Sequence, residues 1–394
     1  MRMHSGNDRD PRGDAAPSRQ AVPGADALPR TLELKRDAGG GACLCFIDQN
    51  RLPGVLATRE ARCHGEVVEA IKSLAVRGAP AIGVAGAAAV ALFVINESKA
   101  LDVGTLLGQA AVVAAQVAAA RPTAVNLSWG AGRVMRCARR HSQGGEAYAA
   151  PAAPGAPGTP VTLAALKQAL FDEVKLMEAE DEATNRRIGL AGAPLIPEGG
   201  RVLTHCNAGS LATVFFGTAL GVVYTAAAQG RVERVYAGET RPLGQGARLT
   251  AWEVARAGIP CTLACDSMAA TLMAEGHIDV VLVGADRICR NGDAANKVGT
   301  LGLAVLAAHY GIPFYVVAPT TTVDLPTAAG SEVVIEHRCA DEVSRTLPFG
   351  VEVFNPAFDI TPAGLITAIV TEKGVLKPSE LAALPDEAPE GREV

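Results

Sequence analysis

Two reactive side chains, Cys206 and Asp286, stand directly after short apolar runs that have the composition of buried strands. Cys206 precedes a segment with helical spacing, and the positive end of a helix dipole favours a thiolate. Asp286 follows DVVLVGA, and a carboxyl group desolvated there would have a raised pKa and could donate a proton near neutral pH. Each residue alone also has an ordinary interpretation, a buried thiol or a helix cap. The pair together indicates a candidate acid, base or nucleophile.

Three other positions have the residue types that bind anions. Arg77-Gly78-Ala79-Pro80 places a guanidinium and a glycine directly before a predicted helix, where backbone N–H groups can bind a phosphate. Arg121, in RPTAVNLSWG, could act in the same way, and Asn296-Lys297 is expected to open a further helix. Either arginine alone is more typical of an ordinary surface or ion-pair residue. The residues by themselves therefore predict an α/β enzyme with a small phosphorylated ligand.

No motif for a nucleotide cofactor or a metal accompanies these residues. The sequence has no Walker loop and no GxGxxG after a strand. Cys261 and Cys265 are four positions apart, but no second pair or nearby histidine completes a zinc-finger spacing. We therefore expect neither a cofactor nor a metal.

Composition narrows the class of protein. The chain has 394 residues, of which 49% are hydrophobic and 20% charged, so disorder of the whole chain is not expected. Its net charge of -5 argues against nucleic-acid binding. Nine cysteines, an odd number, without a secretory segment indicate reduced thiols inside the cell. The uncharged stretch from Gly78 to Ile95 is rich in Ala and Gly, which predicts a packed helix and no membrane partner.

The elements that must position these residues follow from the pattern after Arg201. Short apolar runs alternate there with helical ones, which is typical of a parallel sheet with helices on both faces. In such sheets ligands bind beyond the carboxyl ends of the strands. Polar or small residues follow four of the runs, which predicts one shared pocket floor; these are 206–209, 239–241, 265–267 and 284–287.

This pattern divides the chain into three parts. We expect a disordered tail over residues 1–30, and then a smaller, mainly helical N-terminal domain over 31–190 with a Pro/Ala-rich loop at 142–160. Residues 191–394 are expected to form a Rossmann-like C-terminal catalytic domain.

Long runs of the sequence are similar to a known family in order and spacing. The chain resembles the methylthioribose-1-phosphate isomerases of methionine salvage over nearly all of residues 31–378. Their superfamily also contains ribose-1,5-bisphosphate isomerases and regulatory subunits of the translation-initiation exchange factor, so the fold alone does not decide the function. The runs that carry the resemblance are VRGAPAIGVAGA, RPTAVNLSWG, LTHCNAGSLAT, YAGETRPLGQGARLTAWE, DSMAA, VGADRICRNGDAANKVGTLGLAVLA and NPAFDITPAGLITAIVTEKGVL.

The resemblance implies a role for each candidate residue. Asp286 would be the proton donor, and Cys206 would assist at the transition state. One departure from the family pattern is His205, where Gln is expected. The residues implied to bind substrate are Arg77, Gly78, Ala79, Arg121, Gln245, Asn296 and Lys297.

The resemblance also implies the reaction, which converts 5-methylthioribose 1-phosphate to 5-methylthioribulose 1-phosphate without a cofactor. It further implies a homodimer in the cytoplasm, with the nucleus as a second location. Two alternatives stay open at this stage: a ribose-1,5-bisphosphate isomerase and a non-catalytic regulatory subunit.

Overall fold

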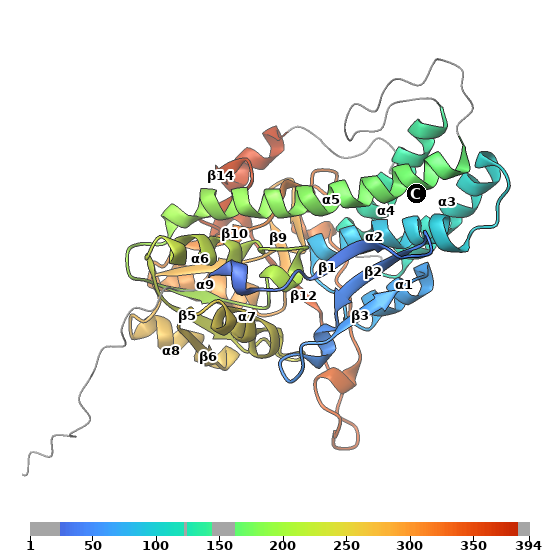
Figure 1. Ribbon diagram of the computed structural model, residues 1–394. Helices are drawn as coiled ribbons and strands as arrows, with labels where there is room; N and C mark the ends of the chain where they lie inside the picture. Colours follow the sequence, from blue (N-terminus) through green and yellow to red (C-terminus); the bar gives the residue numbers. More distant parts are fainter. Residues whose placement is uncertain (1–23, 122–123, 144–161, 385–394) are drawn as a thin grey trace, which may run out of the picture.

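The protein folds as an α/β structure with two hydrophobic cores that share one long helix. The computed structural model describes residues 24–121, 124–143 and 162–384. Helix α5 (Leu163–Gly192) runs along both cores (Figure 1). Its first half, with Leu166 and Leu170, packs into the N-terminal core, and Ile188 packs into the C-terminal core. Because α5 crosses residue 190 and contacts both cores, the domain boundary at that position stays a prediction.

The N-terminal core combines a small antiparallel sheet with four helices. Strand β2 lies between β1 and β3, and its alternate residues Leu44 and Phe46 point into the core. The elements are β1 (Leu32–Arg36), β2 (Ala42–Ile47), β3 (Thr58–Ala61), α1 (His64–Lys72), α2 (Ala79–Leu92), α3 (Val103–Ala119) and α4 (Val125–Ser142).

Helix α2 is the centre of this core. Every residue of α2 except Pro80 is buried, and its backbone approaches α4 so closely that a Cβ on Gly130 would overlap Gly83. The segment Ala79–Glu97 is long and apolar enough to cross a membrane, but 83% of it is buried inside the protein. The predicted packed helix is confirmed.

The C-terminal core is built on a seven-stranded sheet, parallel except for β14 at one edge. Its order is β14-β13-β10-β7-β4-β5-β6, so its six parallel strands have the 3-2-1-4-5-6 arrangement of a Rossmann sheet. The direction in which successive strands are added to the sheet therefore reverses between β4 and β7. The strands are β4 (Gly200–Thr204), β5 (Val232–Gly238), β6 (Cys261–Ala264), β7 (Val280–Val283), β10 (Phe314–Val317), β13 (Ala368–Thr371) and β14 (Gly374–Leu376).

Helices cover both faces of this sheet, as the alternating pattern predicts (Figure 1). On one face Val202 and Leu282 pack in a cluster with residues of α5, α6 (Ala219–Ala228) and α7 (Ala251–Arg256). On the other face Leu203 and Val281 pack with α8 (Ala269–Ala274) and α9 (Thr300–Tyr310). Neighbouring residues of one strand thus point into different clusters, because side chains alternate across a strand.

A second sheet, which the sequence reasoning missed, follows Asp286. It contains β11 (Val323–Asp324), β8 (Arg287–Cys289), β9 (Ala294–Lys297) and β12 (Phe358–Thr361), in that order. The expectation that Asn296-Lys297 opens a helix is wrong, because both residues end strand β9 and α9 begins only at Thr300. The Asn291-Gly292 dipeptide, a strong turn signal between two short runs, could have revealed this hairpin.

Two further expectations need correction or lie outside the described residues. The predicted tail over residues 1–30 is too long, because Ala25 and Leu28 are buried in the C-terminal core; residues 1–23 lie outside the described part. Of the predicted loop at 142–160, Ser142 ends α4 and Gln143 follows it. Residues 144–160 are not among those described.

We expect the stability of the protein to depend on the titration of Asp181 in α5. Asp181 accepts a hydrogen bond from the Val214 backbone N–H at 2.7 Å, and burial raises its pKa from 3.8 to about 7. The folded state thus binds a proton more tightly than the unfolded state, and this stabilisation is lost as the pH rises from about 4 to 7. Lowering the pH from about 8 to about 5 should raise the melting temperature of the protein relative to Asp181→Asn. A constant difference between the two melting curves would contradict the assignment.

Candidate functional site

A small pocket lies where the N-terminal core meets the carboxyl ends of β4 and β7, the point at which the strand order reverses. Open parallel sheets bind ligands at this position. The pocket has a volume of about 30 Å³, so it must widen before a sugar phosphate can enter. It is lined by residues 77–80, 205–208, 284–286, Ala212, Thr213, Thr218, Asn296, Ala318 and Pro319.

Asp286 is positioned by the loop that leaves β7. Its backbone N–H donates to the Ala295 carbonyl oxygen at 2.9 Å, and strand β8 follows it at once, so it does not cap a helix. Burial raises the pKa of its carboxyl group, although the nearby cations Lys297, Arg121 and Arg77 act in the opposite direction. A carboxyl group with a raised pKa in a pocket is suited to donate a proton.

Cys206 shares the pocket with Asp286, in a constrained backbone conformation. Its φ is 60°, in the left-handed region that residues other than glycine rarely adopt. The backbone N–H of Cys206 donates to Thr240 Oγ1 at 2.8 Å, and its carbonyl oxygen accepts from Thr250 Oγ1 at 2.6 Å. These bonds fix the backbone of Cys206 where the residue lines the pocket.

The predicted helix dipole at Cys206 is wrong. The segment that follows is a loop with a single 3₁₀ turn at Ser210–Ala212, and α6 begins only at Ala219. A cation close enough to interact is instead Lys297, whose charged form is stabilised by negative charge on Cys206 or on Asp286. Burial lowers the pKa of Lys297.

Of the four strand ends expected to form one pocket floor, two line the pocket and two support it. The ends of β4 and β7 carry Cys206 and Asp286. At the ends of β5 and β6, Asp266 accepts from the backbone N–H groups of Thr240 and Arg241 at 2.8 and 2.7 Å. Asp266 thus fixes Thr240, which in turn holds Cys206.

Glu253 of α7, a residue that the sequence reasoning missed, holds the loop after Cys206. Its fully buried carboxylate accepts from the backbone N–H groups of Ser210 and Leu211 at 2.7 and 2.9 Å. Asn207 Nδ2 and the Tyr224 hydroxyl donate to it at 3.1 and 2.9 Å. Burial raises the pKa of Glu253, while the four donors favour its charged form.

Arg77 and Gly78 join the N-terminal core to this loop. Arg77 Nη1 and Nη2 donate to the side-chain and main-chain oxygens of Asn207 at 2.6 and 2.7 Å. Gly78 has a φ of 95° and lies so close to Ala212 that an added Cβ would overlap its backbone. Arg77 therefore both lines the pocket and positions the loop that carries Cys206.

The other predicted substrate-binding residues surround the pocket at different distances. Asn296 lines it, and the buried Lys297 donates to the Ala357 carbonyl oxygen at 2.8 Å. Arg121 lies 3.5 Å from Glu336 and its Nε has no hydrogen-bond partner among the described residues. Gln245 is buried, and its Oε1 likewise has none. Neither Arg121 nor Gln245 lines the pocket in its narrow form.

His205, the departure from the family pattern, forms part of the pocket wall. It is buried, its Nε2 lies 2.9 Å from the Val298 carbonyl oxygen, and burial lowers its pKa. A neutral imidazole therefore adds no positive charge beside Cys206.

Potential metal ligands do not gather at this pocket. Within the described ranges, one group of three has its ligand atoms within 4.8 Å of one another: Cys43 and Cys45 on β2 with Glu60 on β3. None of the three lines the pocket.

Comparison with known proteins identifies the family. A model of the Initiation factor 2 subunit family matches residues 75–378. The chain belongs to this family.

Isomerases of this family are among the similar proteins. The methylthioribose-1-phosphate isomerase of Chloroflexus aurantiacus is 48% identical over 90% of this chain and 97% of its own. The 5-deoxyribose 1-phosphate isomerase of Moorella thermoacetica is 49% identical over 84% and 91%. The solved structure of 5-methylthioribose 1-phosphate isomerase from Pyrococcus horikoshii covers 89% of this chain and 93% of its own, with 39% identity and a TM-score of 0.78. The family thus gives the fold of this chain, and the similar isomerases give its class of activity.

We expect Glu253 to be essential for the stability of the loop after Cys206. Glu253→Gln keeps the shape but turns an NH₂ group toward donors, which should lower the free energy of unfolding by about 3 kcal/mol. Tyr224→Phe removes one donor and should cost about 1 kcal/mol. Urea unfolding measures both effects.

Tyr315→Phe is the matched control for Tyr224→Phe. The Tyr224 hydroxyl donates to Glu253, whereas the Tyr315 hydroxyl has no hydrogen bond to a described residue. Equal stability of Glu253→Gln and Tyr315→Phe would show that the carboxylate does not organise the loop.

Proposed function

We propose that this protein isomerises 5-methylthioribose 1-phosphate to 5-methylthioribulose 1-phosphate in methionine salvage. The observation that carries the proposal is the placement of Cys206 and Asp286 in one pocket at the strand-order reversal. Relatives at about 48% identity that are named for this activity support it. The reaction is an aldose–ketose isomerisation, and the residues assigned below need no cofactor for it.

Arg77, Gly78, Ala79, Arg121, Gln245, Asn296 and Lys297 are the proposed substrate-binding residues. The start of α2, with its free N–H groups and Arg77, suits the phosphate. Two hydrogen bonds to Asn207 already hold the guanidinium of Arg77 in place. A phosphate would therefore bind to a side chain that is fixed before the phosphate arrives. Pre-organisation of this kind lowers the entropic cost of binding.

The phosphate on C1 blocks the anomeric oxygen, so the ring cannot open to a free aldehyde as the ring of an unmodified sugar does. In the proposed mechanism the protonated Asp286 donates its proton to the ring oxygen, and the bond between that oxygen and C1 breaks. Hydrogen then moves from C2 to C1, either as a proton through an enediolate or as a hydride, with Cys206 assisting at the transition state. The C2 hydroxyl gives up its proton as the ketone forms, and this proton restores the acid form of Asp286. Deuterium at C1 after reaction in deuterated water would support the proton route.

The lining favours a methylthio group over a second phosphate. Pro80, Ala208, Ala212, Ala318 and Pro319 give the pocket small apolar walls. A ribose-1,5-bisphosphate isomerase would need a second anion site there. A regulatory subunit would need no acid–base pair at all. Assays of the purified protein with methylthioribose 1-phosphate, 5-deoxyribose 1-phosphate and ribose 1,5-bisphosphate compare the candidates, and turnover of none would refute the enzyme proposal.

Substitution of either proposed catalytic residue should lower kcat much more than stability. Asp286→Asn keeps the shape but has no transferable proton, and Cys206→Ser raises the side-chain pKa and lowers its polarisability. Each change should reduce kcat by about 10²-fold or more with a similar KM. The double variant should lose much less than the product of the single losses. A near-normal kcat in the single variants would show that both residues have only structural roles.

The pH dependence of kcat should report Asp286. Its pKa is raised by burial, and the acid form is the proposed donor, so activity should be retained at low pH and fall as the pH rises through the raised pKa. Asp286→Asn should lose this limb of the profile in its residual activity. A profile that falls only on the acidic side would contradict the assignment of Asp286 as the acid.

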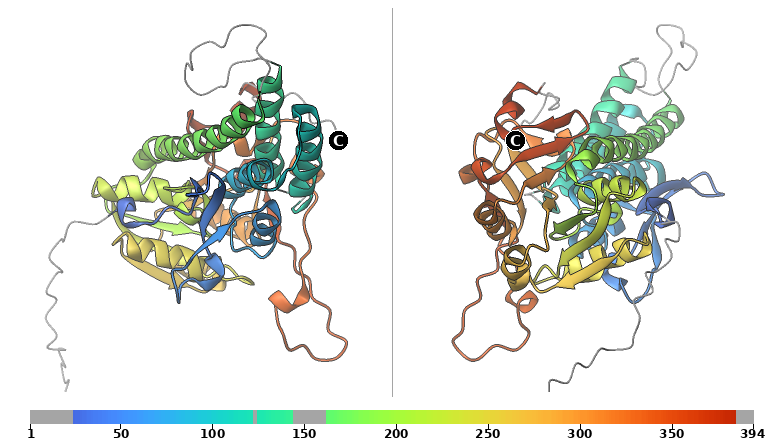
Figure 2. Two further views of the ribbon diagram at one scale, coloured as in Figure 1. Left: turned by 45° about the vertical axis from the view of Figure 1, so that its right-hand side comes forward. Right: turned by 90° about the vertical axis from the view of Figure 1, so that its left-hand side faces the viewer.

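We further propose a cytoplasmic homodimer. An arm over residues 338–355, closed by a bridge between His337 and Pro356, extends from the body (Figure 2). It exposes Leu347, Phe349, Val351 and Phe354, and exposed apolar side chains of this kind mark protein interfaces. The comparisons provide no support for the nucleus as a second location.

Light scattering should give the mass of two chains for the purified protein. Phe349→Ser with Phe354→Ser should shift the equilibrium towards one chain, because the apolar contacts of the arm are lost. A dimer of unchanged stability in the double variant would place the interface elsewhere.

A further inference from the structure

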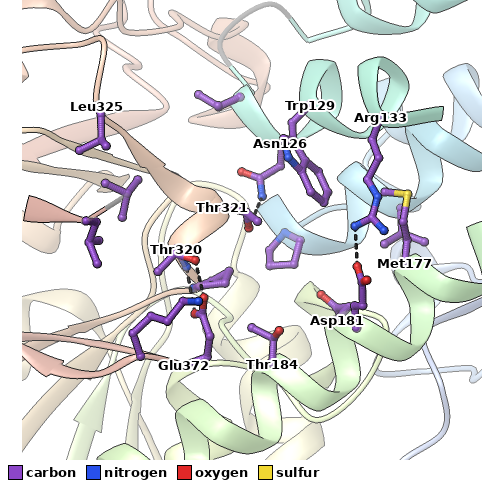
Figure 3. Close-up of a pocket in the computed structure, with 18 of the residues that line it drawn as sticks. Asn126, Trp129, Arg133, Met177, Asp181, Thr184, Thr320, Thr321, Leu325 and Glu372 are labelled. Atoms are coloured by element: carbon purple, nitrogen blue, oxygen red, sulfur yellow. Dashed lines mark hydrogen bonds and ion pairs between the residues drawn. The ribbon is translucent and has the colours of Figure 1, made fainter. Parts of the chain in front are cut away.

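A cavity much larger than the pocket of Cys206 and Asp286 lies beside that pocket. It has a volume of about 690 Å³ and lies between α4, α5 and the loop that follows β10 (Figure 3). Figure 3 shows Asn126 and Trp129 of α4 in its wall, with Thr321 next to Asn126 and Thr320 next to Glu372. Its size is typical of a small-molecule site.

The acidic side chains on its wall are already bound within the protein. Glu173 and Glu180 both bind Arg133, at 2.6 and 2.5 Å. Asp181 accepts from the Val214 backbone N–H at 2.7 Å, and Glu372 accepts from the Thr320 backbone N–H at 3.0 Å. These carboxylates are therefore not available to bind a cation in the cavity.

Basic side chains of α4 also line the cavity, and one of them, Arg136, is not bound to a carboxylate of the described residues. Arg133, Arg136 and Arg140 are spaced three and four residues apart, so they lie on one face of α4. Arg136 makes no hydrogen bond or ion pair with a described residue, and its guanidinium lies against Gly132 of its own helix. Burial and the neighbouring Arg140 and Arg133 lower its pKa, while Glu173 opposes this effect. The guanidinium of Arg136 thus has no hydrogen-bonded carboxylate among the described residues.

The rest of the wall provides one polar atom without a partner and an apolar surface. Asn126 is 1% exposed, and its Oδ1 has no hydrogen-bond partner among the described residues. Its Nδ2 lies 3.5 Å from Thr321 Oγ1, beside it in the cavity wall (Figure 3). Trp129, Met177, Val84 and Leu325 add apolar contacts. A buried amide oxygen without a partner is costly unless a ligand or water donates to it.

We propose that this cavity is a second small-molecule site, which binds a compound with a phosphate or carboxylate group next to an apolar group. Arg136, with Arg133 and Arg140 beside it, binds the anion. Trp129 and Met177 contact the apolar group, and Asn126 Oδ1 accepts a hydrogen bond from the ligand. The site is separate from the pocket of Cys206 and Asp286, and its occupation does not depend on the isomerase reaction.

The two sites are coupled through the segments that separate them. Pro80 and Pro319 line both the cavity and the pocket. Pro80 belongs to the first turn of α2, beside Gly78 and Ala79, and Asp181 in the cavity wall holds Val214 in the loop after Cys206. A ligand that shifts any of these contacts changes the shape of the pocket, so we expect it to change the KM of the isomerase.

The test uses 8-anilinonaphthalene-1-sulfonate, an aromatic anion, as the probe for the full-length protein. The chain has two tryptophans, so Trp252→Phe leaves Trp129 as the reporter. We expect the probe to quench Trp129 fluorescence, inorganic phosphate to weaken its binding, and Arg136→Ala in this background to raise its Kd by about tenfold or more. Arg139→Ala, at an exposed residue of α4 that does not line the cavity, is the matched control and should leave the Kd unchanged.

A steady-state assay then separates a second site from an extension of the first. In the wild-type protein the probe should change KM, and in Arg136→Ala, with its own kcat and KM near the wild-type values, this effect should be lost. Equal Kd values for Arg136→Ala and Arg139→Ala would overturn the proposal. A large rise in KM for the substrate in Arg136→Ala without probe would also overturn it, because the cavity would then belong to the substrate site.

Discussion

The buried carboxylate of Glu253 is the interaction on which the site depends. It binds four donors, and three of them belong to the loop between β4 and α6. Burying a charge is costly unless hydrogen bonds compensate it, so the loop is held in the one conformation that supplies all of these donors. Cys206 enters that loop with a left-handed backbone, and Asn207 presents two oxygens to Arg77. The geometry of the pocket thus follows from a charge that lies outside it.

The pocket needs both cores, because neither contains a complete set of groups. The C-terminal sheet brings Cys206 and Asp286 to neighbouring strand ends, and the first turn of α2 brings Arg77 from the N-terminal core. Gly78 permits the close approach of the two parts at Ala212. Helix α5, which packs into both cores, adds the contact from Asp181 to Val214. Motion of one core relative to the other would therefore open or close the pocket, whose present volume of about 30 Å³ is too small for a sugar phosphate.

Within the Initiation factor 2 subunit family, one fold serves enzymes and other functions, so side chains must decide the activity. In this chain a buried lysine, Lys297, lies near Asp286 and favours the charged form of that carboxyl group against the effect of burial. The arm that starts near His337 is linked to the same site, because Glu336 lies 3.5 Å from Arg121 and its charge opposes ionisation of Asp286. Association of two chains through the arm would thus change the electrostatic environment of Asp286.

The sequence by itself determined the alternation of strands and helices, the packed helix after Gly78 and the candidates Cys206, Asp286 and Arg77, because these rest on local periodicity and on residue type. It did not reveal that Asn296 and Lys297 end a strand, since pairing of β9 with β8 and β12 is a long-range interaction. It also could not reveal Glu253, a glutamate in an amphipathic segment that resembles any surface residue until the chain folds around it. The helix dipole expected at Cys206 failed for the same reason: tertiary hydrogen bonds to Thr240, Thr250 and Glu253 outweigh the helical preference of SLATVFFGT. Local sequence decides which elements form, whereas only the tertiary structure decides which buried charges and backbone strains hold the reactive groups together.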